Sequence, residues 1–349
     1  MKRTFGRIIG LLLLGPLFAA CSFGAEPQPQ QSTPRSQPTA RPVAVQAGVS
    51  IDGRLLFVQD GNLYLHRGQQ TQQLTRDGLT RDPAWSPDSS RIAFVRRAES
   101  FSDIYLLDAD GGLPTQVTFN GGQSQPWTQE FMHEVVWASS PTWTPDSQNL
   151  VFLSQVSPPT VSPPAEFPLS IYSYSIDLLG TRQPTNDDLL VRSNEDDLQR
   201  PAWAPDDSAL AYVQVPRGAE PKRIMLYDAN TGERSAYPGI PENAYDPTWS
   251  PDSRWLAFAA VVDGQTDIWA IPHPAIGGSA VRLTNSGAAR APAWSPDGDQ
   301  LAYIQVGDSG TDVYVMDLQV AEGTLTLGTA EALTNNGQID ANSGLSWGK

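Results

Sequence analysis

The chain has 349 residues, of which 38 are acidic and 23 are Lys or Arg, so its formal net charge is −15. Nucleic-acid binding rests on a basic surface, so this charge argues against a nucleic-acid partner and against long-range attraction to an anionic lipid surface. The single cysteine has no partner for a disulfide.

Residues 1–20 are predicted to be a lipoprotein signal peptide. Three basic residues precede an apolar run at 8–20, which is too short to span a bilayer as a helix. The run ends Leu17-Phe18-Ala19-Ala20-Cys21, which resembles a bacterial lipobox with Phe18 where Leu is usual. The resemblance implies cleavage before Cys21 and acylation of its sulfur, which would anchor the protein to a membrane. Ordinary secretion with a free thiol is the alternative.

Residues 21–49 are rich in Pro, Gln, Ser and Thr. Such a segment lacks the apolar side chains needed to bury a core, so it is predicted to be a disordered tether. The folded domain is expected over residues 50–349.

That domain is built on a repeated hexapeptide, Pro-x-Trp-x-Pro-Asp. Five complete copies begin at Pro83, Pro141, Pro201, Pro247 and Pro292, and a clipped copy, Gly344-Leu345-Ser346-Trp347, closes the sequence. The copies recur every ~45–60 residues, a period typical of propeller blades.

One unit, residues 83–118, shows what each copy encodes. Strands are expected at 83–85, 92–95 and 104–107 and in a segment ending at Thr118, joined by tight turns. The two middle strands are apolar on successive residues, which indicates burial on both faces. A four-stranded sheet packed between two copies of itself provides that environment.

The fold class predicted is therefore all-β, a six-bladed β-propeller of four-stranded antiparallel blades. Five units are complete. The sixth would combine strands near residues 54–58, 62–65 and 72–75 with the last segment, Gly344–Trp347, so that the two ends of the domain share one blade. A seventh blade would have to be hidden near residues 119–140.

The repeat resembles the WD40-like PD40 repeat of the TolB family over about residues 53–348. The resemblance implies a six-bladed propeller exported to the cell envelope, and for TolB itself a role beside the peptidoglycan-associated lipoprotein. TolB carries an α/β domain before its propeller, where this chain has the tether. Related propellers also precede the hydrolase domain of prolyl-oligopeptidase-like peptidases. We expect no Gly-x-Ser-x-Gly nucleophile elbow in these repeats and therefore no serine hydrolase.

Two long insertions, 119–140 and 154–170, are expected on the face opposite the Trp-x-Pro-Asp turns. Loops on a rigid scaffold often carry binding sites, so the first insertion supplies candidate partner-binding residues. These candidates are Trp127, Phe131, His133 and Trp137. The alternative is an insertion that only packs its aromatic side chains onto the propeller.

On the same face, residues just before the inner strands are expected to surround the mouth of the central channel. They include Asp82, Arg200, Asp246 and Arg290. A mixed-charge ring suits a polar peptide or a sugar, or it only lines a solvated, salt-bridged funnel.

The first functional hypothesis is a non-catalytic cell-envelope lipoprotein, a monomer that binds an envelope protein or a peptidoglycan or other glycan ligand through the face carrying 119–140 and 154–170. It would be anchored to the cell membrane or outer membrane, facing the periplasm or the exterior. The alternative is a glycan hydrolase or lyase that uses Asp82, Asp246 or Glu134 at the channel mouth. A self-assembling surface protein is a third class. No cofactor or metal is predicted, because the three histidines lie in different units.

Overall fold

A computed structural model describes residues 49–126, 128–155, 168–193, 195–274, 278–321 and 324–349. The signal peptide, Cys21, the tether up to residue 48 and Trp127 lie outside these residues. Predictions about them stay predictions.

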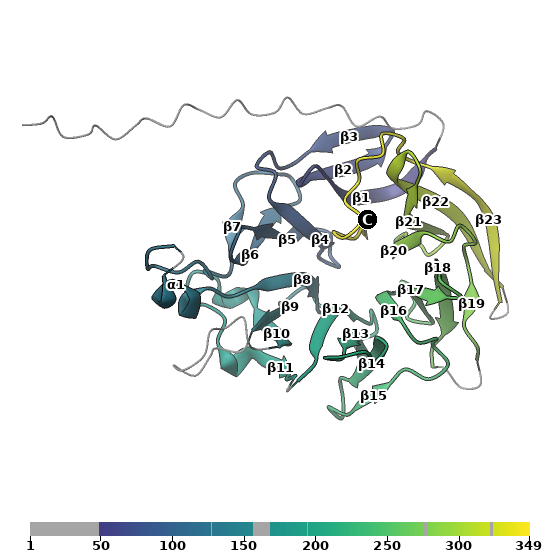
Figure 1. The fold of residues 1–349 in the computed structure, drawn as a ribbon. Helices are drawn as coiled ribbons and strands as arrows, with labels where there is room; N and C mark the ends of the chain where they lie inside the picture. The colour runs from purple at the N-terminus through teal and green to yellow at the C-terminus, as the bar shows by residue number, and fades with distance from the viewer. Residues whose placement is uncertain (1–48, 127, 156–167, 194, 275–277, 322–323) are drawn as a thin grey trace, which may run out of the picture. The chain divides into compact units, whose positions relative to one another are not determined.

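The described chain forms six four-stranded antiparallel sheets arranged as blades around a central axis (Figure 1). In every blade the strands follow one another from the inner to the outer edge. Blade 1 is β24 (Ser346–Gly348), β1 (Ile51–Gln59), β2 (Asn62–Gly68) and β3 (Gln70–Gln73). Blade 2 is β4 (Thr80–Trp85), β5 (Arg91–Arg97), β6 (Ser102–Asp108) and β7 (Thr115–Gln116). Blade 3 is β8 (Ala138–Trp143), β9 (Asn149–Gln155), β10 (Leu169–Ser175) and β11 (Leu189–Val191).

The remaining blades have the same order. Blade 4 is β12 (Asp197–Trp203), β13 (Ala209–Val215), β14 (Arg223–Asp228) and β15 (Arg234–Ala236). Blade 5 is β16 (Ala244–Trp249), β17 (Trp255–Val262), β18 (Gln265–Pro272) and β19 (Val281–Arg282). Blade 6 is β20 (Ala289–Trp294), β21 (Gln300–Gly307), β22 (Gly310–Ala321) and β23 (Thr324–Ala332).

The ring closes as the sequence predicts. Strand β24 pairs with β1, with Leu55 opposite Trp347 and Leu56 opposite Ser346. Inner strands of successive blades touch all the way round, β20 against β24 and β24 against β4. The six-bladed propeller with one shared blade is confirmed.

Short helices occupy the connections. The insertion near 119–137 holds α1 (Gln129–Glu134), and η2 (Ile176–Leu178) and η3 (Asn186–Asp188) lie in blade 3. No strand is found in the described part of 119–137, so a seventh blade does not lie there. Among the residues described, no helix has the length and apolar character needed to cross a bilayer.

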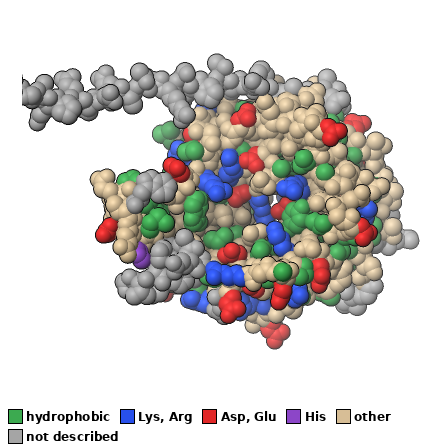
Figure 2. All heavy atoms as spheres, in the orientation of Figure 1, with side chains coloured by type: hydrophobic (Ala, Val, Ile, Leu, Met, Phe, Trp, Pro, Cys, Tyr) green, Lys and Arg blue, Asp and Glu red, His purple; other side chains and the backbone are tan. Residues whose placement is uncertain are grey.

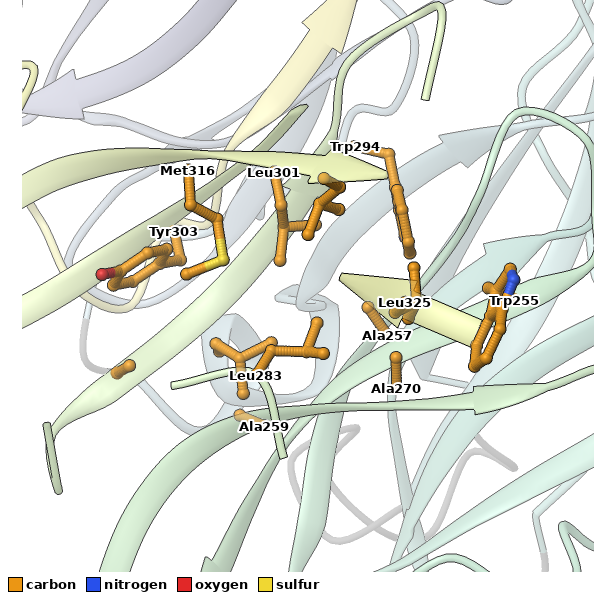
Figure 3. Close-up of a cluster of buried hydrophobic side chains, with 13 residues drawn as sticks. Trp255, Ala257, Ala259, Ala270, Leu283, Trp294, Leu301, Tyr303, Met316 and Leu325 are labelled. Carbon is orange, nitrogen blue, oxygen red and sulfur yellow. The ribbon is translucent and has the colours of Figure 1, made fainter. Parts of the chain in front are cut away.

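Apolar side chains fill the spaces between blades. Figure 3 shows the cluster between blades 5 and 6, where Ala257 and Leu283 from one blade meet Trp294, Leu301 and Met316 from the other. Since each blade is covered on both sides, successive residues of the middle strands are buried. This explains the unbroken apolar runs in the sequence.

The Pro-Asp part of the repeat builds the turn between the inner and second strands. In blade 2, Asp88 Oδ1 accepts hydrogen bonds from Ser86 Oγ at 2.6 Å and Ser90 N at 3.0 Å. Its own N–H donates to Ser147 Oγ in the turn of blade 3, at 3.1 Å. The motif thus closes one turn and ties it to the next. We call the side of the ring that carries these turns the turn face, and the opposite side the loop face.

The tryptophan of the repeat joins neighbouring blades. Nε1 of Trp143 donates to the Ala84 carbonyl of blade 2 at 3.3 Å, and Nε1 of Trp249 donates to the Ala202 carbonyl of blade 4 at 3.0 Å. Both indoles are buried. Each therefore contributes apolar burial and an inter-blade hydrogen bond.

A second recurrent contact lies near the loop face, at the start of the third strand. In blade 2, Thr118 Oγ1 donates to Asp103 Oδ1 at 2.9 Å and accepts from Ile104 N at 2.9 Å. Asn120 N also donates to Asp103, which fixes the following loop. We call this contact the Asp–Thr latch. Equivalent pairs are Asp267 with Thr284 and Asp312 with Thr334.

Candidate functional site

The central channel is shaped by a bulge in the inner strand of five blades. One residue before each repeat proline sits at positive φ: Asp82, Ser140, Arg200, Asp246 and Ala291, between 47° and 52°. None is glycine, so the strand holds a conformation that such residues adopt rarely. The pairing register breaks at the same points. A bulge re-aims side chains, and all five residues line the channel.

Arg200 crosses this channel. Its Nη1 lies 3.0 Å from Asp82 Oδ1 in blade 2, and its Nε lies 3.3 Å from Asp246 Oδ1 in blade 5. Its Nη2 donates to the carbonyl of Asn342, which precedes β24 in the blade opposite its own. One guanidinium thus joins four of the six blades and narrows the channel near the loop face.

Electrostatics favour the charged form of this arginine. Burial alone lowers the pKa of Arg200, but the carboxylates of Asp82 and Asp246, with Asp340 beyond them, outweigh burial, so its pKa lies above the ordinary value. Asp82 is further held by Ser140 N at 3.1 Å. Both carboxylates are thus engaged with the arginine that lies between them.

Other charges surround this group. Arg81 pairs with Asp340 at 3.1 Å, and Arg290 Nη1 donates to Asn342 Oδ1 at 3.3 Å. Figure 2 shows Lys and Arg side chains gathered with acidic ones around the centre of the face in view. Arg290 and Lys222 both lie over the ring of Tyr245, at 5.9 and 5.5 Å. Among the described residues, neither has a carboxylate at ion-pair distance.

The insertion 119–140 forms a compact rim beside this mouth. Thr128 caps α1 by accepting from Phe131 N, and Glu134 accepts from the N–H groups of Gln123 and Ser124. Phe131 is buried within the rim, whereas Met132 is exposed. The partly buried indole of Trp137 lies under the guanidinium of Arg97, at 5.2 Å.

The residues that the sequence predicted for a binding site therefore lie in different settings. It brings Asp82, Arg200 and Asp246 into one cluster and places Arg290 against the same Asn342. Phe131 serves as packing, while His133 and Trp137 are partly exposed on the rim. Trp127 and most of the insertion 154–170, residues 156–167, lie outside the described residues.

A site that sequence reasoning missed opens on the turn face. The channel widens there into a funnel of about 520 Å³. Its wall carries the six repeat tryptophans and the repeat prolines, and Asp82, Arg200 and Asp246 lie at its inner end. The signal was present in the sequence, because a repeat that places Trp and Pro at one end of every inner strand must gather them around the axis.

The pattern Gly-x-Ser-x-Gly does occur once, at Gly344–Gly348, which corrects the expectation that the repeats contain none. A nucleophile elbow exposes its serine on a turn between a strand and a helix. Ser346 instead lies in the innermost strand of blade 1, and its Oγ accepts a hydrogen bond from the backbone N–H of Trp85 at 2.9 Å. Its setting is that of a structural residue. Among the described residues, no three His, Cys, Asp or Glu side chains are grouped to hold a metal.

Comparison with known proteins agrees with this geometry. Residues 176–336 match the family model described as TolB beta propeller domain. The crystal structure of TolB from Acinetobacter baumannii matches 84% of the chain with a TM-score of 0.63 at 19% identity, and 66% of that protein is covered. The described fold is a β-propeller similar to that of TolB.

Two further relatives sharpen the comparison. The structure of a putative TolB from Agrobacterium tumefaciens matches 86% of this chain and 100% of its own length, with a TM-score of 0.54 at 17% identity. An uncharacterized peptidase of Bacillus subtilis, YuxL, is 26% identical over 237 residues, or 57% of this chain. The chain spans only 33% of that relative's length.

Proposed function

We propose that this TolB-type propeller is a non-catalytic cell-envelope lipoprotein, exported and anchored through Cys21, that binds a protein or cell-wall partner at its loop face. The observation that carries the proposal is Arg200. Asp82 and Asp246, the carboxylates best placed for catalysis at the channel mouth, both engage this one guanidinium. General acid–base work needs a carboxyl group free to exchange a proton with substrate. The arrangement therefore favours recognition over hydrolysis.

The chemistry of the loop face supports a partner that carries carboxylates. Arg290 and Lys222 flank Tyr245, and Arg97 lies on Trp137, while the protein as a whole is strongly acidic. Cations held over aromatic rings are pre-positioned, which lowers the entropy lost when they bind an anionic group. Phe119 and Met132 add exposed apolar surface on the neighbouring rim.

The place where the chain enters the propeller is consistent with a binding surface on the loop face. Strand β1 begins at Ile51 on the turn face, because second strands run from the turn face to the loop face. The segment expected to act as the tether therefore joins the propeller on the turn face. This first strand therefore begins on the face opposite the proposed binding surface.

The experiment compares two charge reversals in the full-length protein purified in detergent. Arg290→Glu changes the loop face, and Arg67→Glu makes the same change at an exposed site in β2. Each variant is used to capture components from solubilised envelopes. We expect Arg290→Glu to lose, and Arg67→Glu to keep, whatever the wild type captures.

Equal capture by both variants would reject the loop face as the binding surface. Release of soluble fragments from purified glycans by the wild type would instead support the alternative, a glycan hydrolase or lyase. For the anchor, Cys21→Ser should move the protein from the membrane fraction to the soluble fraction. Retention in the membrane fraction would reject lipid anchoring at this residue.

A further inference from the structure

The six repeat tryptophans are not equivalent. Trp85, Trp143, Trp249 and Trp294 are at most 7% exposed, whereas Trp203 and Trp347 are partly exposed. Trp203 belongs to blade 4 and Trp347 to blade 1, which lie opposite each other in the ring. Both line the funnel on the turn face. The funnel therefore has two accessible indoles on opposite walls.

The indole N–H groups of this pair are already satisfied. Trp203 Nε1 donates to Asp207 Oδ1 at 2.7 Å, within its own blade, and Trp347 Nε1 donates to the carbonyl of Asp52 at 2.7 Å. These bonds fix the orientation of both rings without using their faces. Fixed aromatic rings with exposed surface are typical of binding sites, because little side-chain entropy is lost on contact.

Two other polar groups of the funnel wall have no partner. Trp294 Nε1 and Ser343 Oγ are buried and make no hydrogen bond within the described residues. Ser343 is 1% exposed, Trp294 is 5% exposed, and both line the funnel. They lie in neighbouring blades, 6 and 1. A buried N–H or O–H without a partner is unfavourable by ~1–3 kcal/mol, so a ligand carrying acceptors would relieve a penalty here.

Most remaining polar groups of the funnel are used within the fold. Ser86 and Ser295 donate to the aspartates of their own turns, and Ser89 accepts from Lys349 N. Asp82 and Asp246 are held by Arg200. Of the charged residues that line the funnel, Lys349 alone is outside these ion pairs, so a charged ligand finds little compensation. The hydroxyls of Ser140, Thr142 and Thr248 are the groups that remain for a polyhydroxylated ligand. The wall suits a ligand that is uncharged, apolar at its sides and rich in acceptors.

We propose that the turn-face funnel binds an extended, proline-containing peptide segment of another protein. A polyproline II chain presents carbonyl acceptors without proline N–H donors, and its rings dock between aromatic side chains. Trp203 and Trp347 would contact the rings, and Trp294 Nε1 and Ser343 Oγ would donate to carbonyls. This site is separate from the loop-face site of the proposed function and does not depend on it.

The test uses isothermal titration of the full-length protein with a capped decaproline peptide. A capped Gly-Ser decapeptide and chitohexaose serve as comparison ligands. We expect saturable binding of decaproline only. Trp203→Ala and Trp347→Ala should each weaken it at least about tenfold, as aromatic anchors do. Trp294→Phe and Ser343→Ala, which remove one donor each, should weaken it about two- to tenfold.

Leu113→Ala, at an exposed apolar residue outside the funnel lining, is the control and should bind decaproline like the wild type. Ser343→Ala removes a single oxygen, so it keeps the test informative if a tryptophan variant fails to fold. The proposal is overturned if decaproline does not bind saturably, if the Gly-Ser peptide binds equally well, or if the funnel variants bind like the wild type. Chitohexaose binding that is lost in the same variants would make the funnel a glycan site instead. Envelope capture that depends on Arg290 is a separate readout, so failure of one proposal does not decide the other.

Discussion

On the turn face, Asp146 and Asp297 lie in solvent, whereas Asp103, beneath the loop face, is buried. A hydrogen bond from Thr144 lowers the pKa of Asp146, and one from Ser295 lowers the pKa of Asp297. Burial raises the pKa of Asp103 despite its hydrogen bonds to Asn120, Thr118 and Gln116. The repeat therefore uses aspartate in two ways: as an exposed anion that closes a turn, and as a buried acceptor that holds a loop.

The two ends of the channel also differ in the side chains that line them. The loop-face end is narrowed by charged side chains that bind one another across blades, with Arg200 at the centre. The turn-face end is open and lined by indoles and prolines. Within that lining, Trp143 joins two blades while Trp203 turns to its own Asp207. Identical repeat positions thus serve either stability or an accessible surface.

The largest effect is expected from breaking the inter-blade tryptophan. Trp143→Ala removes a side chain that is 3% exposed together with its bond to Ala84, so it should lower the free energy of unfolding by about 3–5 kcal/mol. Trp203→Ala, at the partly exposed equivalent position, should lower it by only about 1 kcal/mol. Urea unfolding followed by circular dichroism measures both. Similar losses would show that the two indoles play the same role.

The Asp–Thr latch should give the next largest effect. Thr118→Val keeps the shape of the side chain but leaves Asp103 and the N–H of Ile104 without its hydroxyl, which should destabilise the fold by about 1–3 kcal/mol. Thr115→Val makes the same change at an exposed site in β7 and should stay within about 0.5 kcal/mol of the wild type. Indistinguishable unfolding midpoints for the two variants would show that the latch does not stabilise the fold.

Removing the cation at the channel mouth should have a smaller effect. The Arg200 side chain is 27% exposed, so solvent weakens its ion pairs, and Arg200→Gln should destabilise the protein by about 1–2 kcal/mol. Adding Asp246→Asn to that variant should restore part of the loss, since one unpaired carboxylate is then removed. A double-mutant cycle by urea unfolding measures the coupling. Zero coupling would mean that the ion pair contributes nothing to the fold.

The fold could be predicted from the sequence because the repeat marks every inner strand. Pro-x-Trp-x-Pro-Asp fixes five of them, and Gly344–Trp347 fixes the sixth. It also placed Asp82, Arg200 and Asp246 together, because each precedes a repeat proline. It could not show that Arg200 reaches across the channel to Asn342, since this depends on the bulge at positive φ and on the direction of a long side chain.

Trp143 and Trp203 have different hydrogen-bond partners, and the sequence differs at one turn position in a way that accounts for this. The turn position that is Ser89, Ser147 or Ser253 in other blades is Asp207 in blade 4. That carboxylate accepts the indole N–H of Trp203, which then does not bond to the preceding blade. The threonine of the Asp–Thr latch could be identified from the shared Val-Thr and Leu-Thr endings of the outer strands. Its aspartate partner was not recognised, because it lies about 15–22 residues away and meets the threonine only in the folded sheet.

The smallest expected effect tests the contrast between the two kinds of aspartate through pH. The folded pKa of Asp146 lies below its ordinary value of 3.8, so its contribution to stability is present above that pH and is lost as the pH falls through the folded pKa. The stability difference between the wild type and Asp146→Asn should therefore shrink below about pH 4. For Asp103 the folded pKa lies above 3.8, so its contribution is complete below that pH and is lost as the pH rises through the folded pKa. The free energy of unfolding of the wild type should therefore rise relative to that of Asp103→Asn as the pH falls from 7 towards 4. Urea unfolding at intervals between pH 3 and pH 7 gives both slopes, and slopes of the same sign would contradict the division of roles between the two faces.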